Sequence, residues 1–296
     1  MATVVDLGGT KIAAARVAGA KVLERRQAAT PRDGRFESLV DAVAALVAGW
    51  ADGPVGIATT GLVRDGRLTA TNPGTLPVPP DSPLAAALQD RLGVPVRAVN
   101  DAQAAAWGEF RHGAALGAGS MVFLTVSTGV GGGLVLDGRL RGGLAGHLGH
   151  VVAVPDGPLC GCGRRGCVEA IASGRALAAA ATAAFGAAMD APALFRRAET
   201  DAAAAALIDR AAAAIARLLA DLRAALDLDL AVVGGGVGLA EGFLERVNRA
   251  LAVEPPQFRI VLRPAALGHD AGLIGMADLG ASQPLSTKRV SSPREP

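Results

Sequence analysis

Short apolar runs of strand length are separated along the chain by longer segments in which apolar residues recur every three or four positions. The runs lie at 3–5, 55–58, 94–99, 121–126, 230–233 and 258–262. Helical spacing is clearest at 36–50, where Phe36, Leu39, Val40 and Val43 fall on one side. Strands interleaved with helices in this way are typical of the α/β class.

The first apolar run leads into a glycine turn. Asp6 is followed by Gly8, Gly9, Thr10 and Lys11, and a second apolar run comes next. Bare backbone N–H groups, a hydroxyl and an ammonium can bind phosphate oxygens, and Asp6 would sit where a Mg²⁺ ion bridges those phosphates. The G-x-x-x-x-G-K-[ST] spacing of a P-loop is absent. Taken alone, the segment is equally well explained as an ordinary hairpin with a type I′ or II′ turn.

The same order of elements returns in the second half of the chain. The run at 121–126 leads into hydroxyl and glycine residues, namely Ser127, Thr128, Gly129, Val130, Gly131, Gly132 and Gly133. Two such turns at equivalent places indicate a duplicated core with a nucleotide between the halves. The run at 230–233 ends near Gly235 and Gly236, whose bare backbone can admit a flat adenosine group.

A carboxylate stands at the end of another predicted strand. The run at 94–99 ends at Asn100 and Asp101, and a helix is predicted from Ala102 to Glu109. In open α/β sheets, ligands bind at the carboxyl ends of strands beside helix N-termini. Asp101 is therefore a candidate catalytic residue. The alternative is that Asp101 only caps the helix.

All three cysteines fall within eight residues. His150, Cys160, Cys162 and Cys167 form an H-x9-C-x-C-x4-C pattern. Three thiolates and one imidazole complete a tetrahedral zinc shell without an open position, which suits a structural ion. The alternative, buried thiols with one disulfide, leaves an odd cysteine and poor C-x-C geometry. Glu169 closes the segment, so a metal would hold His150 and Glu169 in place on a pocket wall.

The remaining segments carry weaker signals. Gly61 ends a Thr-Thr-Gly sequence that is either a binding loop or a simple turn, and Asn72 is the neutral amide of a proline-rich loop at 72–83. Alanine-rich helix is predicted from 174 to 225, and a last helix begins at His269. The segment 282–296 is rich in Ser and Pro and is expected to be disordered.

Composition excludes several classes of function. The net charge of +2 is accounted for by the basic residues of the C-terminal tail, and aromatic residues make up only 3% of the chain. A nucleic-acid-binding face is therefore not expected. Residues 112–136 lack charged side chains, but their glycines and hydroxyls argue against a membrane span. Reduced cysteines and the absence of a recognisable leader predict a cytosolic protein.

Taken together and in this order, the motifs resemble the ROK (repressor, open reading frame, kinase) family of sugar kinases, over about residues 3 to 280. The resemblance implies two actin-like (ribonuclease H-like) α/β domains around a central cleft. The first would comprise residues 1–112 with 268–281, and the second residues 113–267. It also implies ATP and Mg²⁺ as cofactors, a structural Zn²⁺, a small sugar substrate and a homodimer. Repressors of the family carry a helix-turn-helix ahead of the first hairpin, for which no room is expected before Asp6.

Finer features resemble the bacterial N-acetylmannosamine kinases of that family. They are the Asn100–Trp107 segment, the second glycine turn and Gly143-Leu-Ala-Gly-His-Leu-Gly-His150. ROK glucokinases usually carry Glu where this chain has His147, at a position that touches the 2-substituent of the sugar. Two alternatives stay open: the protein uses glucose, or His147 is an ordinary histidine on the side of a helix. By resemblance, Asp101 is the general base, and the sugar is bound by Gly61, Asn72, Asn100, His147, His150 and Glu169.

Overall fold

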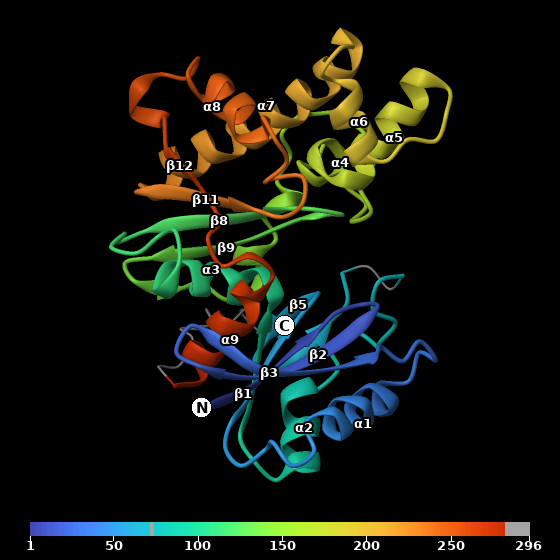
Figure 1. Ribbon diagram of the computed structural model, residues 1–296, viewed down its shortest axis with the longest axis vertical. Coiled ribbons are helices and arrows are strands. Elements are labelled where there is room, and N and C mark those ends of the chain that lie inside the picture. The colour runs from blue at the N-terminus through green and yellow to red at the C-terminus, as the bar shows by residue number, and fades with distance from the viewer. Residues whose placement is uncertain (72–73, 282–296) are drawn as a thin grey trace, which may run out of the picture.

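Two five-stranded mixed sheets form the framework of the computed structural model, which describes residues 1–71 and 74–281 (Figure 1). The first sheet has the order β3-β2-β1-β4-β7, with β1 (Ala2–Leu7), β2 (Lys11–Ala18), β3 (Lys21–Ala29), β4 (Val55–Thr59) and β7 (Val96–Asn100). The second has the order β10-β9-β8-β11-β12, with β8 (Met121–Val126), β9 (Val130–Leu136), β10 (Arg139–Leu140), β11 (Leu230–Gly234) and β12 (Val261–Pro264). A small hairpin joins β5 (Leu62–Arg64) to β6 (Arg67–Thr69).

Both sheets follow the same plan. β1, β2 and β3 are antiparallel neighbours, whereas β1, β4 and β7 run parallel. In the second sheet β8, β9 and β10 are antiparallel, whereas β8, β11 and β12 run parallel. The repetition confirms the predicted α/β class and duplicated core. It also places the carboxyl ends of the parallel strands of each sheet along one edge.

Helices cover the outer faces of both sheets, and two helices lie between them (Figure 1). The bounds are α1 (Phe36–Leu46), α2 (Leu84–Leu92), α3 (Asp101–His112), α4 (Glu169–Ala172), α5 (Gly174–Phe185), α6 (Ala191–Arg197), α7 (Ala202–Leu226), α8 (Phe243–Leu251) and α9 (Ala271–Ala281). α1 and α2 share a core cluster with the first sheet. α4 to α8 share one with the second sheet.

The two central helices, α3 and α9, pack against each other and join the halves. α3 lies mainly against β8 and β9 of the second sheet, and α9 lies against β1 and β4 of the first. The chain therefore crosses between the halves where β7 passes into α3, and it returns ahead of α9. Asp101, the first residue of α3, stands at the first crossing.

A buried carboxylate binds the returning segment to α3. Glu109 is fully buried, and its Oε1 accepts hydrogen bonds from the backbone N–H groups of Ala266 at 2.9 Å and Leu267 at 2.8 Å. Its Oε2 accepts from the N–H of Ala114 at 2.8 Å. One side chain thus connects the segment that leaves α3 with the segment that returns toward α9.

Several expected elements differ in extent or number. The predicted helix at 174–225 is three helices, because Gly186 adopts a left-handed conformation after α5 and Asp190 and Asp201 cap α6 and α7. The strand expected at 258–262 is wrong in position, since a 3₁₀ turn occupies Pro256–Phe258 and β12 begins at Val261.

Helix ends also differ from the expectations. The helix predicted at 36–50 ends at Leu46 and is followed by turns, and α8 begins at Phe243 after Gly242, which has a φ of 73°. α2 begins without a side-chain cap, and the Oγ of the nearby Ser82 donates to the carbonyl of Pro79 at 2.7 Å.

Two expectations fall on residues outside those described. These are the assignment of Asn72 to the sugar site and the disorder of the tail at 282–296. Within the described ranges, the structure contains no helix with the length and apolar character that a membrane span requires.

Candidate active site

A cavity of about 950 Å³ opens at the N-terminus of α3. The two glycine turns, at residues 8–11 and 127–133, and the cysteine segment, residues 150–169, meet there. Of the predicted site residues, it is lined by Gly8, Gly9, Gly61, Asn100, Asp101, Ser127, Thr128, Gly129, Val130, Gly131, His147, His150, Cys160, Cys162 and Glu169. Residues from both halves of the chain therefore contribute to one site.

A second cavity of about 370 Å³ adjoins the first, because Asp101, Ala102, Thr125 and Ser127 line both. It adds the predicted nucleotide residues Asp6, Gly235 and Gly236. Asp101 is the carboxylate common to both spaces. It lies at the junction between the turns expected to bind phosphate and the wall expected to bind sugar.

Some predicted residues line neither of these two cavities. Thr10 and Lys11 are exposed beside the first turn, and Cys167 is buried beneath the cysteine segment. Gly132 and Gly133 lie within β9. A Cβ on Gly132 would come 2.6 Å from the Phe123 carbonyl oxygen, and one on Gly133 would come 2.5 Å from the Ala106 side chain. These two glycines are explained by close packing of β9.

Asn100, and not Asp101, caps α3. Its Oδ1 accepts hydrogen bonds from the N–H groups of Ala102 at 3.0 Å and Gln103 at 3.2 Å, and its Nδ2 donates to the Gly61 carbonyl at 3.0 Å. The amide therefore holds the loop after β4 against the start of α3. The cap interpretation of Asp101 does not hold, although one Asp101 oxygen accepts from the Ala102 N–H at 2.7 Å.

The environment of Asp101 favours proton uptake. Burial, together with the nearby charge of Asp6, raises the pKa of Asp101 to about 6, against the opposing effect of the hydrogen bond from the Ala102 N–H. Burial also raises the pKa of Asp6, against the opposing charge of Lys11. A carboxylate with a pKa near neutrality is suited to general-base catalysis. The oxygens of Asp6 are the kind of donor that Mg²⁺ prefers.

The cysteine segment has the geometry of a closed metal site. The ligand atoms of His150, Cys160, Cys162 and Cys167 all lie within 4.8 Å of one another. The Cys162 and Cys167 sulfurs are 3.7 Å apart, and His150 Nδ1 is 3.6 Å from Cys160 Sγ. A tetrahedral zinc with Zn–S bonds of about 2.3 Å requires sulfur separations of about 3.8 Å. The four residues therefore fit Zn²⁺.

Two parallel imidazoles extend from this segment to the cavity. His147 stacks on His150, with ring centroids 6.2 Å apart and ring planes 11° apart. The buried Nε2 of His147 has no hydrogen-bond partner among the described residues. Burial, and then the neighbouring His150, lower the pKa of His147. A neutral imidazole with an open ring nitrogen is available to a polar ligand group.

Glu169 connects the cysteine segment to the second glycine turn. It begins α4, and its Oε2 accepts a hydrogen bond from the N–H of Val130 at 2.9 Å. Glycine at the neighbouring position leaves room for this contact, because a Cβ on Gly129 would lie 2.6 Å from the same oxygen. This hydrogen bond therefore joins the start of α4 to the second glycine turn.

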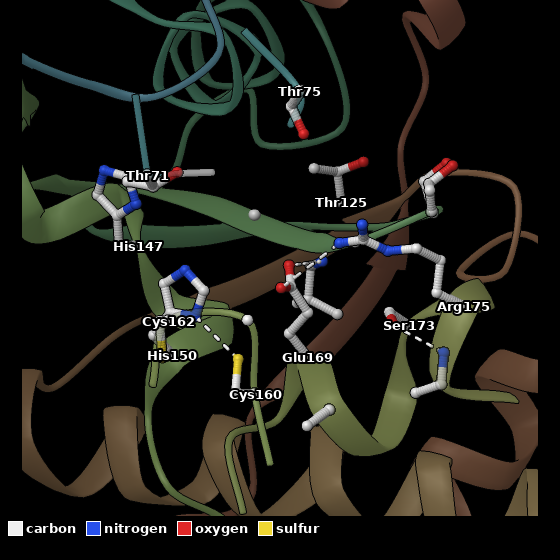
Figure 2. Close-up of a pocket in the computed structure, with 18 of the residues that line it drawn as sticks. Thr71, Thr75, Thr125, His147, His150, Cys160, Cys162, Glu169, Ser173 and Arg175 are labelled. Carbon is white, nitrogen blue, oxygen red and sulfur yellow. Dashed lines mark hydrogen bonds and ion pairs between the residues drawn. The ribbon is translucent and has the colours of Figure 1, made fainter. Parts of the chain in front are cut away.

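The sequence motifs do not indicate Arg175, whose side chain extends over Glu169 in Figure 2, with its Nη2 3.9 Å from Glu169 Oε1. Arg210 on α7 also lines the cavity. Both lie in the alanine-rich stretch 174–225, where neither belongs to a recognisable motif. The one available signal for Arg175 is its place at the start of the helix that follows the cysteine segment.

Comparisons with known proteins agree with this geometry. N-acetylmannosamine kinase of Citrobacter koseri is 49% identical over 280 residues, covering 92% of this chain and 96% of the relative. The crystal structure of a ROK hexokinase from Thermus thermophilus matches with a TM-score of 0.82 at 39% identity, covering 93% of this chain and 96% of that one.

A ROK glucokinase from Streptomyces griseus, solved in complex with glucose and AMPPNP, matches with a TM-score of 0.76 at 35% identity, covering 94% of this chain and 98% of that one. The expectation of two actin-like halves is confirmed by these matches and by the duplicated sheets. The ROK family model itself matches residues 2–283. On this evidence the chain belongs to the ROK family.

Proposed function

We propose that the protein transfers the γ-phosphoryl group of ATP to the 6-hydroxyl of N-acetylmannosamine. The observation that carries this proposal is the position of Asp101, at the junction of two adjoining cavities. One cavity contains the glycine turns and the His147–His150 wall, and the other adds Gly235 and Gly236. The similarity to a protein named N-acetylmannosamine kinase, at 49% identity, supports the choice of sugar.

The chemistry follows from a base placed beside the acceptor. Asp101 would accept the proton of the sugar 6-hydroxyl as that oxygen attacks the γ-phosphorus. The backbone N–H groups of the two turns would stabilise the charge on the transferring group. Asp6 would hold Mg²⁺, which when bound neutralises phosphate charge. Thr10 and Lys11 would act at the first turn when the cleft is closed.

The sugar would be held by residues of both walls. Asn100 and Gly61 come from the first half, and Glu169, His150 and His147 come from the second. His150 would direct Nδ1 to zinc and leave Nε2 for the sugar. The ion would thus order the sugar wall without taking part in phosphoryl transfer. Asn72 stays a candidate ligand on sequence grounds.

Closure of the cleft would complete the site and exclude water, which otherwise competes as an acceptor. We propose that residues 1–112 with 268–281 and residues 113–267 move as two domains, with α3 at their interface. We also propose that the protein acts as a homodimer in the cytosol. Light scattering would test the dimer.

A panel of N-acetylmannosamine, N-acetylglucosamine, glucose and mannose tests the substrate. We expect N-acetylmannosamine to give the highest kcat/KM. His147→Glu should shift preference toward glucose, because a carboxylate replaces the neutral imidazole at the sugar wall. Equal rates with glucose would favour a ROK glucokinase instead. Binding of sugar without ATP turnover would indicate a sugar-sensing regulator.

A further inference from the structure

The main cavity contains few positive side chains for a ligand as charged as ATP. Among the described lining residues, the guanidinium or ammonium groups are those of Arg175 and Arg210, and the carboxylates Asp101 and Glu169 add negative charge. Kinases stabilise the transferring phosphoryl group with fixed positive charge. Besides Lys11 at the first turn, a further cation for this purpose should therefore be sought among these two arginines.

The backbone of Arg175 is attached to the second glycine turn. The N–H of Gly174 donates to the Ser127 carbonyl at 2.7 Å, and the N–H of Arg175 is directed at the Thr128 carbonyl at 3.4 Å. The next N–H, of Ala176, is capped by the Ser173 hydroxyl. The first N–H groups of α5 are therefore occupied. What α5 offers a phosphate at this turn is the Arg175 side chain.

The present partner of that side chain holds it weakly. The 3.9 Å separation from Glu169 Oε1 is longer than a hydrogen bond, and the Arg175 side chain is 57% exposed. A cation as exposed as this one can readily exchange such a partner for another. The other oxygen of Glu169 is already bonded to Val130 N–H. Oε1 is thus the Glu169 oxygen available to a sugar hydroxyl.

We propose that Arg175 is a catalytic residue that binds the γ-phosphate of ATP and couples nucleotide binding to sugar binding. This inference rests on the proposed kinase function. When a sugar hydroxyl takes Glu169 Oε1, the guanidinium moves to the γ-phosphate oxygens beside the Ser127–Gly129 turn. It donates hydrogen bonds to those oxygens throughout transfer and neither gains nor loses a proton. The proton of the acceptor hydroxyl goes to Asp101.

The decisive test compares AMPPNP with ADP, which lacks the γ-phosphate, by calorimetry in the presence of the sugar. Arg175→Gln should weaken AMPPNP binding about tenfold or more and leave ADP binding within about twofold, since one charge-assisted contact is lost. Turnover should fall by about 10²–10³-fold, as when one transition-state donor is removed. The affinity for sugar measured without nucleotide should change little, and AMPPNP should no longer raise it.

Two further variants separate this role from a structural one. Arg217→Gln removes an equal charge from an exposed position on α7 that lines neither described cavity, and it should leave every parameter unchanged. Arg175→Lys should recover part of the lost turnover, because an ammonium keeps the charge but not the two-pronged geometry.

The outcomes are distinct. Equal loss of AMPPNP and ADP binding, or turnover within twofold of the parent protein, would overturn the proposal. If no sugar is phosphorylated, the proposed function fails, and the comparison of AMPPNP with ADP still decides whether Arg175 recognises a γ-phosphate.

Discussion

Asp6 and Asp101, at the end of β1 and the start of α3, line one cavity together, and the charge of Asp6 adds to burial in raising the pKa of Asp101 to about 6. Two carboxylates from opposite ends of the first half of the chain thus face the same space. The charge of Asp6 therefore affects the protonation of Asp101, the proposed base, in the free protein. The first two predictions depend on this raised pKa.

We expect kcat/KM to fall as the pH is lowered through about 6, because the base must be unprotonated to accept a proton. Below that pH, the decrease should approach tenfold per pH unit. Initial rates between pH 5 and pH 8 would measure it, with circular dichroism at pH 5 as the control for folding. A profile that stays flat down to pH 5 would exclude Asp101 as a base with this pKa.

Asp101→Asn should lower turnover by at least about 10²-fold and leave sugar affinity nearly intact. The same change should stabilise the fold at neutral pH. The raised pKa of Asp101 means that its charged form is disfavoured in the folded state, so its contribution to stability is fully present below pH 3.8 and is lost as the pH rises through about 6.

Thermal denaturation of parent and variant at pH 7.5 and at pH 4 separates the two effects. The gain in Tm should be large at pH 7.5 and much smaller at pH 4, where the folded parent protein is already protonated at this position. Near-normal turnover in the variant would remove Asp101 from the mechanism, whatever the effect on stability.

Cys162→Ser should remove bound zinc and sugar affinity together. Cys162 is exposed, so the change costs little packing, but it deletes one of four ligands in a set whose atoms lie within 4.8 Å of one another. Elemental analysis and calorimetry with sugar would follow both properties. The matched control is the parent protein treated with chelator and then supplied with zinc, which should regain affinity. A metal-free protein that phosphorylates sugar at the normal rate would contradict the scaffold role.

Glu109→Gln should lower the free energy of unfolding by about 1.5–3 kcal/mol, because a buried acceptor of backbone hydrogen bonds is replaced by a group that also carries N–H donors. Since Glu109 connects α3 to the segment returning toward α9, the KM for both substrates should rise as well. Urea denaturation and steady-state kinetics would measure the two effects.

Asp229→Asn is the matched control for that experiment. Asp229 also accepts two backbone N–H groups, from Gly119 and Ser120, but it is exposed and lies beside β8 and β11 of the second sheet only. It should leave both KM values unchanged. Equal kinetic effects in the two variants would show that the bonds of Glu109 have no special part in closure.

The motifs predicted much of the site because each depends on neighbours in sequence. The two glycine turns, the Asn100–Asp101 pair and the cysteine pattern are local, and the structure brings most of their residues to adjoining cavities. Arg175 was not predicted, because its contact with Glu169 depends on how α5 docks on the Ser127–Thr128 turn. Helix ends were misplaced where capping residues inside an alanine-rich stretch were overlooked.

By itself, the sequence determined the α/β class and the duplication, and it indicated the candidate metal ligands and the candidate base, since strand periodicity, turn chemistry and ligand spacing depend on short segments. Only the tertiary structure decided that Asn100 caps α3 and not Asp101, that Glu109 joins the two crossings, and that Glu169 bonds to Val130. The contacts of Glu109 and Glu169 pair residues from separate segments of the chain. The cap of α3 depends on which of two neighbouring side chains accepts hydrogen bonds from the first backbone N–H groups of the helix. Such choices depend on packing and burial, which no single stretch of sequence contains.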